Sequence, residues 1–243
     1  MKHILSIIFI LFMVTIANAI PSTTKKVEST PTSIIKTITE SGVIDKIGLI
    51  TINTNDCKNG SPCFVVANTS NNVLSAVNKG LTPTKTHNLI QSIVIPQFDF
   101  SLMTKFAMGN NWKLATPVQQ KELVRLFQNL LIFTYSSALS GFRGAEISIN
   151  SVSYRKSTAS VMTKVLLPNT QNNQSISVEY DLAGTIVESQ PTTWKAYDIK
   201  IENTSLVTTY RTQFNDIIQS NKVDGLIKQL QNKVSNLKSK GDN

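Results

Sequence analysis

The stretch that decides the fold is PQFDFSLMTKFAMGNNWKLATPVQQ, which occupies residues 96–120. Its first half predicts a short helix over Phe100–Met108, where apolar residues recur at helical spacing. Gly109 follows where the helix should end, because glycine readily adopts the left-handed backbone of a C-terminal cap. Upstream of the stretch, the apolar pattern predicts further helical segments, one from Asn71 and one over Thr84–Val94.

The second half of the stretch starts a longer helix, which we expect over residues 117–139. Thr116 is a favourable N-cap, and the proline after it occupies the first helical position. Gln119 completes a capping box with Thr116. Gly141 supplies the stop signal at the other end. Leucine and phenylalanine side chains recur at helical spacing between these signals. Around residues 130–133 the helix is apolar on every side, so it should be covered by the sheet and by other helices.

Four segments after this helix predict strands separated by polar turns, and they are Glu146–Tyr154, Ser160–Leu167, Ser175–Ile186 and Thr192–Ile201. Between residues 175 and 182 apolar and polar residues alternate strictly, as in a sheet with one face in water. The short connections favour an antiparallel meander. Two helices are expected after residue 205. This order predicts an α+β fold in which helices pack on one face of the sheet.

The N-terminus has the pattern of a secretory signal peptide, which we expect over residues 1–19. A short basic start precedes an apolar run over Ile4–Ile16, and Ala17-Asn18-Ala19 is an A-x-A cleavage signature. The run is shorter than the roughly 20 residues of a membrane-spanning helix. No cysteine follows it, which argues against a lipoprotein anchor. We expect cleavage after Ala19 and an exported, soluble chain, with an uncleaved N-terminal anchor as the alternative.

The two cysteines of the chain, Cys57 and Cys63, flank an Asn-Gly-Ser-Pro cluster. In an exported chain this spacing predicts a structural disulfide that closes a hairpin. Ile50–Ile52 and Phe64–Val66 are the expected strands of that hairpin, and residues 33–50 have room for a short helix. The spacing is not the Cys-x-x-Cys of a redox motif, and two thiols alone make a poor zinc site.

The balance of charge is strongly positive, with 24 Lys and Arg against 15 Asp and Glu and a net charge of +9. Export disfavours nucleic acid as a partner, and the sequence has no motif of interleaved aromatic and basic residues. Five lysines are spread along the last expected helix: Lys222, Lys228, Lys233, Lys238 and Lys240. They form either a solvated helical face or a surface attracted to phospholipid headgroups or to a protein partner.

The sequence lacks the motifs of the common enzyme classes. It contains no Gly-x-Ser-x-Gly elbow, no His-Glu-x-x-His, no phosphate loop and no Gly-x-Gly-x-x-Gly. His87 is the one histidine after the expected signal peptide, and its polar neighbours indicate an exposed residue at a helix start. We therefore expect no enzymatic activity, no catalytic residues, no metal site and no cofactor.

Further ordered segments extend the opening motif. The segments are Pro96–Phe100, Met103, Gly109, Trp112 and Ala115–Gln120, then Phe127, Leu130, Thr134-Tyr135 and Leu139, and finally Trp194, Tyr197-Asp198, Ser205–Val207, Tyr210-Arg211 and Phe214. In this order and spacing the chain resembles the MlaC family of periplasmic phospholipid-binding proteins, also called toluene-tolerance or ABC-transporter auxiliary components. The resemblance runs from about Asn71 to Leu230. It implies one MlaC-like lipid-binding domain over residues 71–243, preceded by an extension over residues 20–70 that carries the disulfide hairpin.

The family fold implies a curved antiparallel sheet of about four strands, packed by N- and C-terminal helices around an internal hydrophobic cavity. Thirteen apolar or aromatic residues are candidates for lipid contact: Phe100, Met103, Phe106, Phe127, Leu130, Tyr135, Val161, Val165, Tyr180, Tyr197, Val207, Tyr210 and Phe214. From the residues alone they are most simply a hydrophobic core. The resemblance supplies the alternative, a cavity lined by the same residues.

Three charged residues belong to the motifs of the resemblance. We expect Asp99, Asp198 and Arg211 to form ion pairs or caps that tie loops to helices. Contact between Arg211 and a phospholipid headgroup is the alternative interpretation.

The resemblance implies a monomeric carrier whose bound phospholipid is cargo. Its implied partners are an outer-membrane lipoprotein–porin complex and an inner-membrane ABC transporter with an MCE domain. Exchange of glycerophospholipid between these partners would maintain the lipid asymmetry of the outer membrane. Two other functions stay open: an exported protein that binds another hydrophobic ligand, such as an isoprenoid or sterol-like lipid, and a periplasmic interaction protein with a filled interior.

Overall fold

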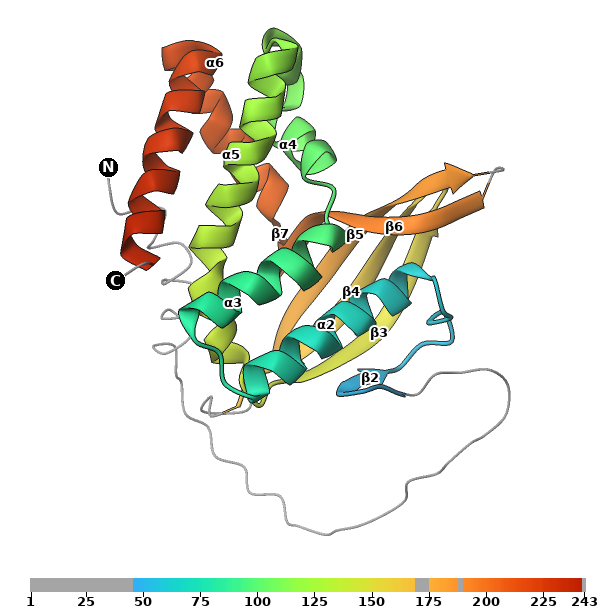
Figure 1. The fold of residues 1–243 in the computed structure, drawn as a ribbon. Helices are drawn as coiled ribbons and strands as arrows, with labels where there is room; N and C mark the ends of the chain where they lie inside the picture. The colour runs from blue at the N-terminus through green and yellow to red at the C-terminus, as the bar shows by residue number, and fades with distance from the viewer. Residues whose placement is uncertain (1–45, 169–174, 188–189, 242–243) are drawn as a thin grey trace, which may run out of the picture. The chain divides into compact units, whose positions relative to one another are not determined.

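The computed structural model describes residues 46–168, 175–187 and 190–241, in which helices accompany an open sheet (Figure 1). The described sheet has seven strands in the order of the chain. They are β1 (Lys46–Ile47), β2 (Ile50–Ile52), β3 (Glu146–Arg155), β4 (Thr158–Leu166), β5 (Ser175–Val187), β6 (Gln190–Ile201) and β7 (Thr204–Ser205). The α+β class is confirmed. The expected number of about four strands is wrong, because β1, β2 and β7 are too short to produce an alternating pattern in the sequence.

The antiparallel meander predicted from the sequence is formed by β3 to β6. The sheet as a whole is mixed, since β2 runs parallel to β3 and pairs Ile50 with Ile147. Along β4, Val161 and Val165 are buried on one face, whereas Lys164 is exposed on the other. The sheet therefore has one apolar face and one polar face.

The segment before the meander differs from its predicted hairpin. Phe64–Val66 is not a strand but lies in the first turn of α2 (Pro62–Asn78). Ser61 caps this helix by accepting a hydrogen bond from the Phe64 amide, and proline occupies the first helical position. These signals outweigh the strand preference of the Phe-Val-Val sequence. The helix thus begins nine residues before Asn71, and the expected boundary between residues 70 and 71 falls inside it.

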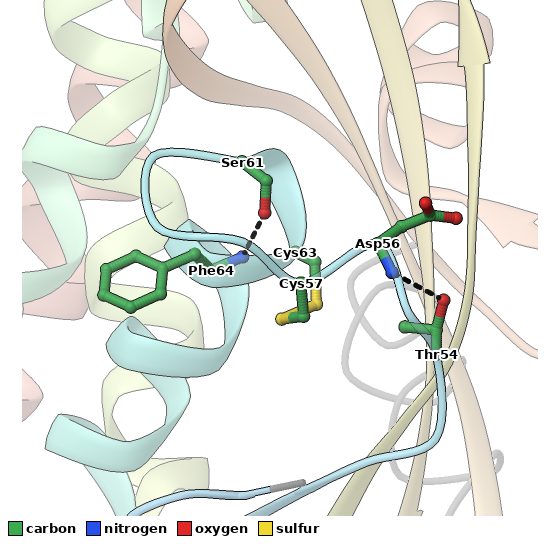
Figure 2. The surroundings of a disulfide bond; sticks show 6 residues. All are labelled: Thr54, Asp56, Cys57, Ser61, Cys63 and Phe64. Carbon is green, nitrogen blue, oxygen red and sulfur yellow. Dashed lines mark hydrogen bonds between the residues drawn. A yellow bond between two sulfur atoms is a disulfide. The ribbon is translucent and has the colours of Figure 1, made fainter. Parts of the chain in front are cut away.

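The predicted disulfide is present between Cys57 and Cys63, whose Cα atoms are 4.9 Å apart (Figure 2). It joins the turn after β2 to the second residue of α2, rather than two strands of a hairpin. Residues 46–50 of the segment expected to form a short helix lie in β1, its turn and the start of β2. The remainder of that segment and the signal peptide lie outside the described residues.

The helices between α2 and the meander follow the predicted order. They are α3 (Pro83–Leu89), the π-helix η2 (Ile90–Val94), the 3-10 helices η3 (Ile95–Gln97), η4 (Gly109–Leu114) and η5 (Ser136–Phe142), α4 (Phe100–Met108) and α5 (Pro117–Tyr135). The capping box at the start of α5 is confirmed: the Gln119 amide donates to Thr116 Oγ1, and the Thr116 amide donates to Gln119 Oε1. Gly109 ends α4 with φ of 55°, a conformation that favours glycine.

The last helix, α6 (Leu206–Gly241), consists of two arms. Lys222 interrupts it with φ of 57° and ψ of −173°, so the arms cover residues 206–221 and 223–241. This interruption agrees with the two closing helices predicted from the sequence. In Figure 1 the chain reverses direction at this point, and the second arm runs back toward the end from which the first arm came.

Buried apolar side chains form two clusters. The helical cluster is built by α4, α5 and α6 and includes Met103, Leu123, Phe127, Tyr210, Phe214 and Leu226. The sheet cluster lies between α2 and the apolar face of the sheet, where Figure 1 shows α2 crossing the strands, and it includes Val66, Leu74, Ile149, Val161, Leu182 and Trp194. Phe98 packs against both clusters. Within the described ranges, no helix combines the length and apolar character needed to cross a membrane.

Candidate functional site

The structure does not bring the thirteen lipid-contact candidates into one site. The helical cluster contains Met103, Phe127, Leu130, Val207, Tyr210 and Phe214, with Phe100 and Tyr135 partly buried at its margin. The sheet cluster contains Val161 and Val165, with Tyr180 partly buried at its margin. Phe106 and Tyr197 belong to neither cluster and contact each other edge to face, with ring centroids 5.3 Å apart.

The enclosed members of the helical cluster act as core. Phe127 has no accessible surface, and its ring meets Tyr210 and Phe214 edge to face at centroid distances of 4.9 and 5.3 Å. Such aromatic pairs add to the stability given by burial alone. A side chain without accessible surface contacts a ligand only after its neighbours move. The fully buried residues of this cluster therefore stabilise the helices.

Four aromatic side chains at the margins of the clusters have a different environment. Phe98, Phe100, Tyr135 and Tyr180 each keep some accessible surface although they pack against the core. Burial raises the pKa of Tyr180 to about 12, so its phenol is deep in the protein. Burial also raises the pKa of Tyr135, a shift that its hydrogen bond with Tyr210 opposes. A side chain that is both deep and accessible can contact a molecule bound inside the fold.

The polar groups beside Tyr135 are neutral hydroxyls. Tyr135 and Tyr210 share a hydrogen bond, and burial raises the pKa of Tyr210 far above its usual value. In the described structure Thr134 Oγ1 is buried and has no hydrogen-bond partner. A region of aromatic rings and neutral hydroxyls suits an apolar ligand, because burying an unpaired charge there would cost far more free energy than burying hydrocarbon.

The polar face of the sheet carries an ionic network instead. Lys200 Nζ lies 2.7 Å from Glu179 and 2.8 Å from Asp181. Partial burial opposes the protonation of Lys200, but the hydrogen bonds and charges of these carboxylates outweigh it and raise the lysine pKa. Tyr197 lines a hollow of about 280 Å³ together with Asp181 and Lys200. This candidate for lipid contact thus lies beside ionic groups, away from the sheet cluster.

A second hollow, also of about 280 Å³, is lined by residues of β2, β3, β4 and β5 that include Glu146, Ser148 and Lys164. Charged side chains line it as they line the first hollow. In the described part of the chain, no group of three or more His, Cys, Asp or Glu side chains is placed to hold a metal ion.

The three charged candidates tie elements together. Asp99 caps α4 by accepting a hydrogen bond of 2.8 Å from the Leu102 amide. Asp198 is buried and accepts hydrogen bonds from the Val207 amide and the Ser205 hydroxyl at the start of α6. Arg211 Nε donates to the Phe106 carbonyl oxygen at 2.7 Å, which joins α6 to the last turns of α4.

Sequence reasoning did not include Phe98 among the candidates, although it lies in the opening motif and packs against both clusters. It directly precedes the cap Asp99, and Met103 lies four residues after the cap, which is the spacing of a hydrophobic staple. Both side chains pack in the helical cluster. The Asp99 amide also donates to the Ala196 carbonyl oxygen at 2.9 Å, so the segment is held against β6. The staple pattern could have identified Phe98 from the sequence.

Comparison with known proteins gives two findings. The family model of the MlaC protein matches residues 67–232, which extend from within α2 to the second arm of α6. A phospholipid-binding protein from Ralstonia solanacearum, solved with a phospholipid at 1.53 Å, is similar in structure, with a TM-score of 0.63. The two sequences are 28% identical over 72% of this chain and 97% of the other.

Proposed function

The chain belongs to the MlaC family, and we propose that it binds a phospholipid and carries it through the periplasm. The observation that supports this most directly is the set of partly buried aromatic side chains at the margins of the helical and sheet clusters. Phe98, Phe100, Tyr135 and Tyr180 offer neutral, apolar contacts to acyl chains. The similarity to a protein solved with a bound phospholipid supports the same class of ligand.

Enclosure of the acyl chains is the main physical requirement for such a carrier. Two acyl chains of about 16 carbons expose about 30 methylenes, each costing about 0.8 kcal/mol in water. The total of about 25 kcal/mol prevents free diffusion of the lipid through an aqueous compartment. In our proposal the tails lie along the apolar face of the sheet and reach the four aromatic side chains. The fully buried residues of the helical cluster then support the site without contacting the lipid.

The direction of transport comes from the partners in this proposal. Transfer from a bilayer to an apolar pocket exchanges one apolar environment for another, so its free energy is close to balanced. We propose exchange between an outer-membrane lipoprotein–porin complex and an inner-membrane ABC transporter with an MCE domain. The expected signal peptide, cleaved after Ala19, would deliver the carrier to the periplasm.

Lipid extraction from the purified protein, followed by mass spectrometry, tests the proposal. We expect a stoichiometric amount of diacyl phospholipid that stays with the protein during native mass spectrometry. An isoprenoid or sterol-like lipid in its place would support the second function left open by the sequence. A protein that purifies without lipid and takes up none from phospholipid vesicles would overturn the carrier function.

A further inference from the structure

The start of α5 exposes two large apolar side chains that the fold does not use. Leu114, the last residue of η4, is 66% exposed, and Val118, the second residue of α5, is 78% exposed. The capping box and the proline between them account for the backbone of this turn. They give no reason for leucine and valine at these two positions, because a polar side chain there would avoid exposing hydrocarbon to water.

Basic side chains accompany this apolar pair. Lys113 is exposed next to Leu114 in η4, and Lys121 is exposed in the second turn of α5. Gln119 Nε2 donates to Asp224 Oδ1 at 2.6 Å, which brings the break in α6 and its exposed Lys222 to the same end of the helices. Figure 1 shows this end pointing away from the sheet. We call residues 113–121 together with Lys222 the basic tip.

Two carboxylates at this end are already engaged. Glu122 pairs with Arg125 at 2.6 Å, and Asp224 accepts the hydrogen bond from Gln119. As far as the described residues extend, Lys113, Lys121 and Lys222 have no carboxylate oxygen within 4.0 Å. Their charges are thus available to an external anionic surface.

The positive charge of the chain is concentrated in the helices that carry the tip. Residues 100–142 and 206–241 contain ten Lys and Arg against three Asp and Glu, whereas residues 143–205 contain six of each. The field of the protein therefore attracts anions toward the helical side rather than toward the meander.

We propose that the basic tip is a docking surface for an anionic phospholipid bilayer. The apolar pair is exposed at the start of α5, and neither hollow described above is lined by tip residues. A bilayer accepts such a protrusion without a matching shape, with leucine and valine among the acyl chains and lysines at the headgroups. A folded acidic partner would need a complementary recess. The inference does not require that the chain itself carries a phospholipid.

Flotation with vesicles of phosphatidylcholine alone, or mixed with phosphatidylglycerol, tests the proposal. We expect the protein to float only with the anionic vesicles and to dissociate in high salt. Lys113→Gln, Lys121→Gln and Lys222→Gln together should weaken binding about 100-fold, since each lysine near an anionic surface contributes a factor of about five. Leu114→Ser with Val118→Ser should weaken it about tenfold or more, because two apolar side chains no longer enter the bilayer.

Two variants serve as matched controls. Lys228→Gln, Lys233→Gln and Lys238→Gln remove the same charge from the second arm of α6, and Leu49→Ser removes an apolar side chain that is 51% exposed in the turn between β1 and β2. Both should float much as the unmodified protein does. Equal weakening by control and tip variants, or no flotation at all, would overturn the proposal. Binding of an acidic protein at the tip without vesicle binding would also overturn it.

The lipid content of each variant separates this inference from the proposed function. Tip variants should retain whatever lipid the unmodified protein contains, because the five side chains that they replace are exposed and lie outside both clusters. Loss of vesicle binding with normal lipid content isolates docking. An empty protein that still floats with anionic vesicles would sustain the docking surface while the carrier function fails.

Discussion

In the helical cluster Phe127 and Phe214 are enclosed on all sides, whereas Tyr180 beside the sheet cluster keeps accessible surface despite its depth. The first arrangement resembles an ordinary close-packed core, in which every contact contributes to stability. The second leaves a surface that a ligand can cover. Apolar residues of one sequence pattern thus lie in two environments, which burial and accessibility together distinguish.

Phe127→Ala should produce the largest effect and tests the stability side of this comparison. Removing a fully buried phenylalanine leaves a cavity and should lower the free energy of unfolding by about 3–5 kcal/mol. Urea denaturation measures the loss. The lipid content of the folded fraction should not change, because Phe127 has no surface to offer a ligand. Loss of lipid from a variant of normal stability would place Phe127 in the binding site instead.

A pair of tryptophan substitutions separates core from lining within the sheet cluster. Val165 is buried, so Val165→Trp should overpack the cluster and lower the free energy of unfolding by about 2–3 kcal/mol. Tyr180→Trp adds volume beside accessible space and should displace lipid with a smaller loss of stability. Thermal unfolding and lipid extraction of both variants give the comparison. Opposite outcomes for the two positions would reverse the assignment.

Removal of the disulfide tests whether the segment before α2 belongs to the site. Cys57 and Cys63 are six residues apart, and the chain-entropy relation gives about 2 kcal/mol for so short a loop. Cys57→Ala with Cys63→Ala should lower the free energy of unfolding by about that amount and leave lipid binding intact. The same measurement on reduced, unmodified protein is the control. A stable variant without lipid would show that the turn covers the ligand.

The smallest effect is spectroscopic and concerns the depth of Tyr180. Burial raises its pKa to about 12 from an ordinary value of 10.0, so the folded state favours the neutral phenol. Stability from this group is complete below pH 10 and should be lost as pH rises through 12. Phenolate absorbance should show one tyrosine titrating near pH 12 that Tyr180→Phe removes, whereas Tyr210 stays neutral to higher pH in both proteins. Ionisation of all tyrosines near pH 10 in folded protein would contradict the assigned depth.

The sequence predicted the long elements well because their signals are local. The capping box at Thr116 and Gln119 lies within one helical turn, and the alternation between residues 175 and 182 lies within one strand. Phe64–Val66 was misassigned because residue preferences favour a strand there, while the neighbouring cap and proline favour a helix.

The short strands and the division into two clusters could not be predicted in the same way. β2 is three residues long and finds its partner in β3, far along the chain. Periodicity identified Phe127 and Tyr180 as buried, but it carries no information on whether the neighbour is a side chain or open space. Tyr197 was placed with the lining candidates because it is an aromatic residue in a motif of the family resemblance. A β-bulge near Asp181 and Leu182 shifts the register there, and Tyr197 faces the ionic network.

The parallel pairing of β2 with β3 has a consequence for the order of folding. Asn53 and Asn150 are joined by a hydrogen bond of 3.1 Å across 97 residues, whereas each hairpin of the meander pairs neighbouring segments. Contacts of such long range form slowly, because a large loop must close first. β2 can pair locally with β1, but its partner β3 is synthesised much later, so the other edge of β2 stays open until the meander exists. An open apolar strand edge attracts other strands, so this early segment of the nascent chain needs protection from aggregation until β3 is in place.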